Sequence, residues 1–277
     1  MSGRTFLNRL GSLAVLLVAL LLGACVTTTT ETHSQAQPPP DLKDRPTASD
    51  ETDAAKRGRA RLELAAAYFS RGQMQTALDQ VKLAIQADPN SSAAFNLRGL
   101  IYANLGDQAL AEESFRRALQ LDPRDADAMQ NYGWYLCQLK RYPEADAMFA
   151  QALAVPQYRD APRTLLAQGV CQAFAGNLDK SEATLSRSYE LDPNNPATAV
   201  NLAEVLYRKG EYERARFFVR RVNSQPEVSN AQTLWLAARI EHRMGNQQGA
   251  DAFGLQLRNR FPQSREASSF QRGAFDE

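Results

Sequence analysis

Histidine and cysteine are scarce in this chain of 277 residues, which has two histidines and three cysteines. His33 lies in a segment that we interpret below as a disordered tether, and His242 lies on a predicted helix. We therefore expect neither a histidine-based catalytic triad nor a metal site with several histidines. Glycine-rich phosphate loops and the Gly-x-Ser-x-Gly turn of hydrolases are also missing. We therefore expect no enzyme, no catalytic residues, no metal, no cofactor and no small-molecule substrate.

The chain also lacks an excess of charge, since 32 Lys and Arg residues against 31 Asp and Glu residues leave a formal net charge of +1. No long block of basic residues occurs, so nucleic acid is not an expected partner. One short basic cluster is present, made of Lys56, Arg57, Arg59 and Arg61. It is either a solvated helix face or a contact for anionic lipid headgroups or for a carboxylate on a partner.

Long apolar runs are limited to one stretch, Leu10–Leu22, which follows a short basic segment. The stretch is too short for a membrane-spanning helix. It continues into Leu22-Gly23-Ala24-Cys25, which resembles the lipobox of a bacterial lipoprotein signal peptide. We therefore predict that residues 1–24 are a signal peptide that is removed. The alternative is an ordinary secretory signal in which the cysteine stands by chance.

Cleavage makes Cys25 the first residue of the mature chain and the site of lipidation. Each buried methylene of an acyl chain contributes roughly 0.8 kcal/mol, so two or three chains anchor a protein stably. The next residue is Val26, whereas Asp at that position marks lipoproteins that stay in the inner membrane. The expected location is therefore the periplasmic face of the outer membrane, through a lipid anchor.

Aromatic residues are absent from the segment that follows, Val26 to Glu51, which instead carries the run Thr27–Thr30 and the stretch Pro38–Pro40. Such a composition cannot bury enough apolar surface to order itself. We interpret residues 25–52 as the lipidated cysteine and a disordered tether.

A repeat of 34 residues fills the rest of the chain, as the spacings from Gly72 to Gly106 and from Pro89 to Pro123 show. This is the period of the tetratricopeptide repeat, in which two antiparallel helices form each unit and the units stack. We predict an all-α, right-handed superhelix, a solenoid of six such units over residues 53–263. Residues 264–277 are predicted to form a short C-terminal cap with Phe270 on the last unit.

Glycine ends the first helix of a unit, because it tolerates a left-handed backbone, and Asp-Pro ends the second. The third unit departs from this pattern. Lys140 replaces its glycine, and after Val155 the next unit begins two residues late, near Pro162.

Cys137 and Cys171 lie in the first helices of the third and fourth units, which stand side by side. In an oxidising compartment such a pair can form a disulfide across the junction where the register slips. Neighbouring helix axes are close to the limit of about 7 Å between Cα atoms that a disulfide tolerates. Two buried free thiols therefore remain the alternative.

A partner-binding groove is expected on the inner side of the superhelix, formed by the first helix of each unit. The residues placed there are Leu62, Phe69, Asn96, Leu100, Asn104, Gln130, Trp134, Leu166, Val170, Phe174, Tyr207, Trp235 and Arg239. Of these, the predicted contacts are Leu62, Phe69, Asn96, Leu100, Asn104, Trp134 and Phe174. Any one of them can instead pack against a neighbouring helix. Leu62 and Ala66 occupy positions where repeats that clamp a terminal carboxylate carry Asn or basic residues, so an extended or helical apolar segment is the better ligand.

Several segments lie outside the general repeat pattern, namely Asn131–Cys137, Arg141–Ala145, Leu234–Ile240 and Leu257–Pro262. Together with the lipobox and the tether, they resemble the pilotins of the PilF/PilW type, lipoproteins of type IV pilus biogenesis. The likeness covers the whole mature chain.

This resemblance implies that the chain binds the outer-membrane secretin of the type IV pilus and promotes its localisation and multimerisation. The first units would then supply the contact surface. The alternative function is a periplasmic scaffold for cell-wall hydrolases or for the assembly of outer-membrane barrels. An enzyme is the third reading.

Overall fold

The computed structural model describes residues 52–275, and this part of the chain holds thirteen α-helices and no strand. Cys25, the predicted signal peptide 1–24 and the predicted tether as far as Glu51 lie outside the described residues. Within residues 52–275 no helix is both long and apolar enough to cross a membrane.

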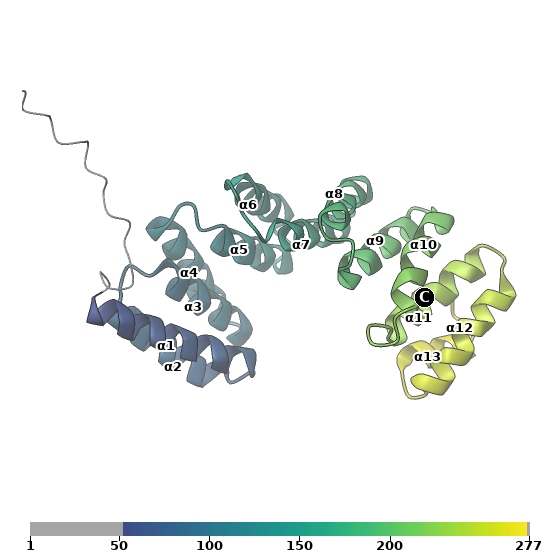
Figure 1. The fold of residues 1–277 in the computed structure, drawn as a ribbon, viewed down its shortest axis with the longest axis horizontal. Coiled ribbons are helices and arrows are strands. Elements are labelled where there is room, and N and C mark those ends of the chain that lie inside the picture. Colours follow the sequence, from purple (N-terminus) through teal and green to yellow (C-terminus); the bar gives the residue numbers. More distant parts are fainter. Residues whose placement is uncertain (1–51, 276–277) are drawn as a thin grey trace, which may run out of the picture. The chain divides into compact units, whose positions relative to one another are not determined.

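The helices follow one another in pairs (Figure 1). They are α1 (Asp53–Ser70), α2 (Met74–Ala87), α3 (Ser92–Leu105), α4 (Gln108–Leu121), α5 (Ala126–Gln138), α6 (Tyr142–Ala154), α7 (Ala161–Phe174), α8 (Leu178–Leu191), α9 (Pro196–Arg208), α10 (Tyr212–Asn223), α11 (Ala231–Arg243), α12 (Gln247–Arg260) and α13 (Arg265–Gln271).

Each odd-numbered helix from α1 to α11, called an A helix here, packs against the next helix, called its B helix. Each B helix then contacts the A helix of the following unit, and A helices of successive units also touch. The short helix α13 packs on α11 and α12. This order of contacts confirms the all-α solenoid of helix pairs.

The A helices end as the repeat pattern predicts. Gly106 closes α3 in the left-handed conformation, with φ 82°. In the third unit Lys140 takes the same role, with φ 61°, although its Cβ makes this conformation unfavourable. The turn geometry is therefore preserved where the sequence lacks the glycine.

The Asp residues of the Asp-Pro pairs cap the B helices. Asp88 and Asp122 are the C-terminal cap residues of α2 and α4. Each also accepts a backbone N–H two residues further on through its Oδ1 atom, from Asn90 at 3.1 Å and from Arg124 at 2.9 Å. The carboxylate therefore forms the turn that leads into the next unit.

Close packing inside a unit requires small residues where the A and B helices touch. At Gly99 of α3, an added Cβ would lie 2.8 Å from the ring of Phe115 in α4. The ring is fully buried and stacks on Tyr132 of α5, with 5.4 Å between the ring centroids. The glycine therefore lets one large side chain join two units.

The register slip lies between α6 and α7. Tyr158 fills it, packing with Val155 against the core of the third unit. Its hydroxyl donates to Asp127 Oδ1 at 3.1 Å and accepts from Thr164 Oγ1 at 3.2 Å. Burial raises the pKa of Tyr158 to about 12.

Within residues 52–275, one carboxylate is fully buried, that of Glu241 in α11. Its Oε1 atom accepts from Arg216 Nε at 2.9 Å and from Arg220 Nη2 at 2.6 Å, both in α10. Its Oε2 atom accepts from Asn246 Nδ2 at 2.6 Å. The buried charge is thus paired and hydrogen-bonded, as a charge out of water must be.

The last unit is covered by aromatic side chains. Phe270 of α13 lies over Gly254, where an added Cβ would be 1.9 Å from the ring. Trp235 of α11 packs edge-on against Phe270 and stacks on Phe275. The position of Phe270 on the last unit agrees with the sequence expectation, whereas the use of Trp235 in the cap does not follow from it.

Candidate partner-binding groove

A groove of about 520 Å³ runs along the A helices of five successive units, from α1 to α9. The residues that line it are Phe69, Leu100, Gln130, Asn131, Trp134, Arg163, Leu166, Ala167, Val170 and Asn201. Most of them are apolar, and Arg163 is the one charged residue among them. Such a surface suits an apolar segment of another protein.

Trp134 and Leu100 line the groove and also pack against the hydrophobic core beneath it. Both are partly buried and pack against a core cluster that contains Cys137 and Cys171. The two cysteines are joined by a disulfide with 2.16 Å between the sulfur atoms and 5.8 Å between the Cα atoms. The indole of Trp134 thus packs against the part of the core in which the disulfide joins α5 to α7.

Amide side chains interrupt the apolar lining. Asn131 donates its Nδ2–H to Asn96 Oδ1 at 3.2 Å, and Asn201 donates to the carbonyl of Ala197 at 2.8 Å. Gln130 is only 5% exposed, and its Oε1 atom is buried without a hydrogen-bond partner in the described chain.

Three of the seven predicted contacts, Phe69, Leu100 and Trp134, line the groove together. Among the wider set placed on the inner side, Gln130, Leu166 and Val170 join them. The structure therefore brings together side chains from α1, α3, α5 and α7 that the repeat positions placed on one face.

Four predicted contacts are not among the lining residues. Leu62 packs against the core of the first unit, and Asn96 is buried behind Asn131. Asn104 is exposed and donates to the carbonyl of Leu100 at 2.9 Å. Phe174 is the last residue of α7 and is 62% exposed.

Three further residues of the wider set also lie elsewhere. Tyr207 is buried, and the guanidinium of Arg239 lies 4.4 Å from the centroid of its ring. Trp235 is covered by the C-terminal cap. These three inner side chains are therefore taken up by contacts within the protein.

Asn131, Ala167, Asn201 and Arg163 line the groove although they were not among the residues expected there. Asn131, Ala167 and Asn201 share position 6 of the third, fourth and fifth units, counted from Ala126, Pro162 and Pro196. The recurrence of asparagine at this position was the signal available in the sequence. Arg163 stands at position 2, which is an inner position of the repeat.

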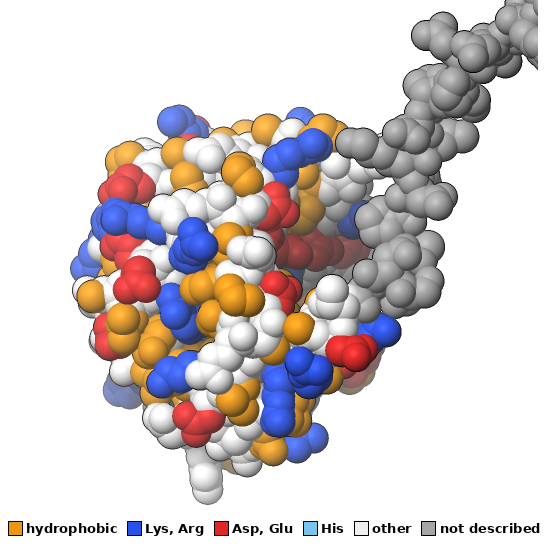
Figure 2. Space-filling view, turned by 90° about the vertical axis from the view of Figure 1, so that its left-hand side faces the viewer, with side chains coloured by type: hydrophobic (Ala, Val, Ile, Leu, Met, Phe, Trp, Pro, Cys, Tyr) orange, Lys and Arg blue, Asp and Glu red, His pale blue; other side chains and the backbone are white. Residues whose placement is uncertain are grey.

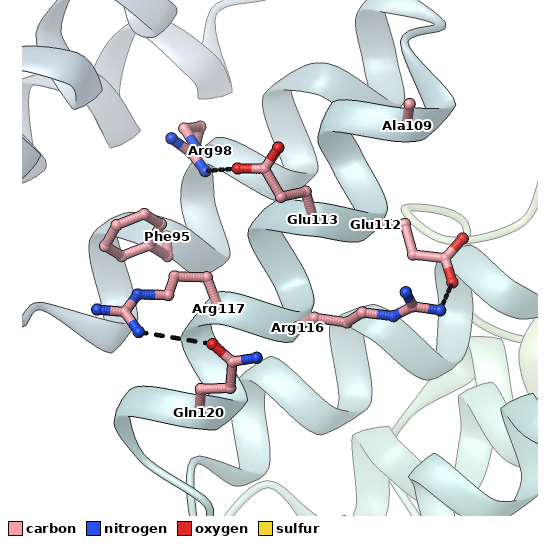
Figure 3. A pocket seen from close by; sticks show the side chains of 8 residues that line it. All are labelled: Phe95, Arg98, Ala109, Glu112, Glu113, Arg116, Arg117 and Gln120. Carbon is pink, nitrogen blue, oxygen red and sulfur yellow. Dashed lines mark hydrogen bonds and ion pairs between the residues drawn. The ribbon is translucent and has the colours of Figure 1, made fainter.

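A second hollow, of about 570 Å³, lies on α3 and α4 and is lined by charged side chains (Figure 3). Arg98 pairs with Glu113 at 3.2 Å, and Arg116 pairs with Glu112 at 2.5 Å. Arg141 also donates to Glu112, at 2.9 Å, and this hydrogen bond is the main reason why the pKa of Glu112 lies below its usual value. These ion pairs neutralise both glutamates of the lining, and Arg117, the third arginine there, donates to Gln120 Oε1 at 3.5 Å.

Charges are mixed over the surface around α1 and α2 as well. Figure 2 looks from the left-hand side of Figure 1 and shows basic, acidic and hydrophobic side chains interspersed on that face. The basic residues Lys56, Arg57, Arg59 and Arg61 are exposed on α1, and Arg61 donates to Gln80 Oε1 at 2.8 Å. In residues 52–275 no group of three or more His, Cys, Asp or Glu side chains is placed to hold a metal ion.

These helix pairs define a tetratricopeptide-repeat protein, and residues 92–125, 114–147, 132–196 and 173–238 match sequence profiles of that repeat. The chain is 32% identical to PilW, a widely conserved type IV pilus biogenesis factor, whose crystal structure superposes with a TM-score of 0.72 over 77% of this chain and 98% of PilW. The chain therefore belongs to the family of PilF and PilW, the tetratricopeptide-repeat proteins of type IV pilus biogenesis.

The similarity to PilF is of the same order. The type IV pilus assembly protein PilF of Pseudomonas aeruginosa is 29% identical over 212 residues, which are 76% of this chain and 84% of PilF. A solved structure of P. aeruginosa PilF superposes with a TM-score of 0.71, over 80% of this chain and all of that one, at 27% identity. Both comparisons support a role in type IV pilus biogenesis.

Proposed function

We propose that the chain is a pilotin, a lipoprotein that binds the secretin of the type IV pilus and promotes its outer-membrane localisation and multimerisation. The observation that carries this proposal is membership of the PilF and PilW family, combined with an apolar groove along five A helices. Membership of the family supports a role in type IV pilus biogenesis, and the groove offers a surface that can hold an apolar segment of the secretin.

Two parts of the chain divide the work in this mechanism. Acyl chains on Cys25 anchor the protein at the periplasmic face of the outer membrane, because two or three buried chains bind a bilayer stably. The solenoid holds secretin subunits through the groove. Binding keeps apolar secretin surface away from water until the subunits meet and form the ring.

The first experiment is a gel of unboiled outer membranes from a deletion strain, probed for detergent-resistant secretin multimers. We expect their loss and their return with the wild-type gene. Undiminished multimers, together with detergent sensitivity or altered peptidoglycan, would contradict the proposal and favour the envelope scaffold.

Two variants separate the roles of anchor and groove. Cys25→Ser is expected to leave a folded protein that still binds the secretin but no longer delivers it to the outer membrane. Val170→Glu places a charge in the groove and is expected to spare membrane location and to weaken secretin binding. Phe174→Ala is the matched control, because its exposed ring lies in the same helix and outside the groove lining. Normal secretin rings with both Cys25→Ser and Val170→Glu would refute the mechanism.

A further inference from the structure

The polar groups of the groove are few, and two of them lack partners in the described chain. Gln130 Oε1 is buried without a hydrogen bond, and the guanidinium of Arg163 makes no ion pair or hydrogen bond within residues 52–275. We propose that these two residues select the occupant of the groove: an extended apolar segment that donates a backbone N–H to Gln130 and places a carboxylate beside Arg163. This inference rests on the proposed function, since it describes the segment of the secretin that is bound.

The first step concerns Gln130 in α5. A buried amide oxygen that forms no hydrogen bond destabilises a fold, because its interaction with water is lost and nothing replaces it. An apolar residue of similar size would avoid this cost at the same position. The side chain nevertheless lines the groove, and a half-turn about its terminal torsion exchanges the positions of the amide oxygen and nitrogen. An N–H group from a bound partner can then satisfy the oxygen, so the side chain fits a binding role better than a packing role.

The second step concerns the kind of segment. In a helix only the first four backbone N–H groups are free, whereas an extended strand offers N–H groups along its whole length. The side-chain oxygens of Asn131 and Asn201 also accept no hydrogen bond from the described residues, while their Nδ2 atoms are held by Asn96 and by the backbone of α9. Amide acceptors from α5 and α9 therefore face the same groove and favour an extended occupant.

The third step concerns charge. Arg163 is the third residue of α7, in the first turn of the helix, and is exposed at the groove. No acidic residue lines this groove, so nothing in its lining neutralises the guanidinium. Arginine recognises carboxylates through two parallel N–H donors. An aspartate or glutamate within an otherwise apolar segment is the complementary group.

The probes are overlapping 15-residue peptides that cover the periplasmic part of the cognate secretin, tested with the full-length protein in detergent. We expect binding of apolar peptides with one acidic residue, and a loss of at least about tenfold in affinity with Arg163→Glu. Replacing the acidic residue of the peptide by lysine is expected to restore binding to Arg163→Glu. Arg187→Glu, an exposed arginine of the B helix α8, is the matched control and is expected to change nothing.

Gln130→Met tests the hydrogen bond at nearly constant side-chain volume. We expect an unchanged or higher thermal midpoint, because no hydrogen bond within the protein is lost. Affinity for the peptide should fall, and methylation of one backbone nitrogen of the peptide should weaken the wild type about tenfold without weakening Gln130→Met further. A lower thermal midpoint with full affinity would assign Gln130 a structural role and overturn the proposal.

Failure of the inference and failure of the proposed function give different results. If neither the peptides nor the intact secretin bind, the secretin is not the partner, and both the proposed function and the inference are wrong. In a second outcome the intact secretin binds but no peptide does, and in a third the peptides bind equally well to wild type, Arg163→Glu and Gln130→Met. Either outcome leaves the proposed pilotin function in place and shows that the groove does not select an extended segment with an acidic residue.

Discussion

Cys137 and Cys171 tie together two neighbouring A helices, α5 and α7, with 5.8 Å between their Cα atoms. Trp134 lies one helical turn before Cys137, and Val170 directly precedes Cys171. Both of these neighbours line the groove. The covalent link therefore stands immediately behind the part of the surface that we propose for partner binding.

The disulfide predicts a measurable stability difference. Alkylation of the unfolded protein without reductant should label neither Cys137 nor Cys171 in a mass spectrum. Cys137→Ser combined with Cys171→Ser is expected to lower the free energy of unfolding by about 4 kcal/mol, which is the loop-entropy contribution of a link that closes a loop of this length. Labelling of both thiols in the wild type would contradict the bond.

Glu241 offers a test of the buried ion pairs between α10 and α11. Glu241→Gln leaves Arg216 and Arg220 without their shared carboxylate and is expected to cost about 3 kcal/mol of stability. Glu213→Gln is the control, since that side chain is mostly exposed and its pair with Arg216 spans 3.6 Å. Urea unfolding of both variants measures the difference, and equal stability would show that Glu241 contributes little.

Lys140 predicts a stabilising substitution. A side chain with a Cβ is strained at φ 61°, so Lys140→Gly should raise the free energy of unfolding by about 0.5 kcal/mol after the added freedom of the unfolded chain is counted. Gly106→Lys, at φ 82° in the equivalent turn, should lower it. Thermal unfolding of the two variants would disprove this account if both changes had the same sign.

Tyr158 predicts a loss of stability in alkali. Its pKa is raised by burial from 10.0 to about 12, so the folded state favours the neutral phenol. The contribution is complete below pH 10 and is lost as the pH rises through about 12. The difference in unfolding free energy between wild type and Tyr158→Phe should therefore shrink over this interval. A difference that does not change with pH would show that the phenol is not held neutral.

Repeat spacing predicted the helix pairs because each unit needs small residues, a left-handed turn and a helix stop at fixed distances. The same reasoning allowed for Lys140 and the slip after Val155. The spacing of the repeat alone does not show which side chains on the inner face pack against neighbouring helices and which remain accessible in the groove. Leu62 and Trp235 occupy inner positions and are taken up by the first core and by the C-terminal cap, because no further repeat shields the ends.

The groove was predicted in part for a related reason. Phe69, Leu100 and Trp134 are large apolar residues at inner positions, which makes them recognisable. Asn131 and Asn201 line the groove from position 6, which was not counted among the inner positions of the repeat. The missing partner of Gln130 depends on the whole surroundings of one oxygen atom, and no pattern in the sequence records it.

The aromatic cap also sets a length. Trp235 is taken up by Phe270 and Phe275, so the groove lining runs from α1 only as far as α9. Five A helices at spacings of about 10 Å give a path of roughly 40 Å, which an extended chain covers with about 12 residues. The length of the groove would thus limit the bound segment to about a dozen residues. The rest of a larger partner subunit would stay outside the groove and would be free to assemble with its neighbours.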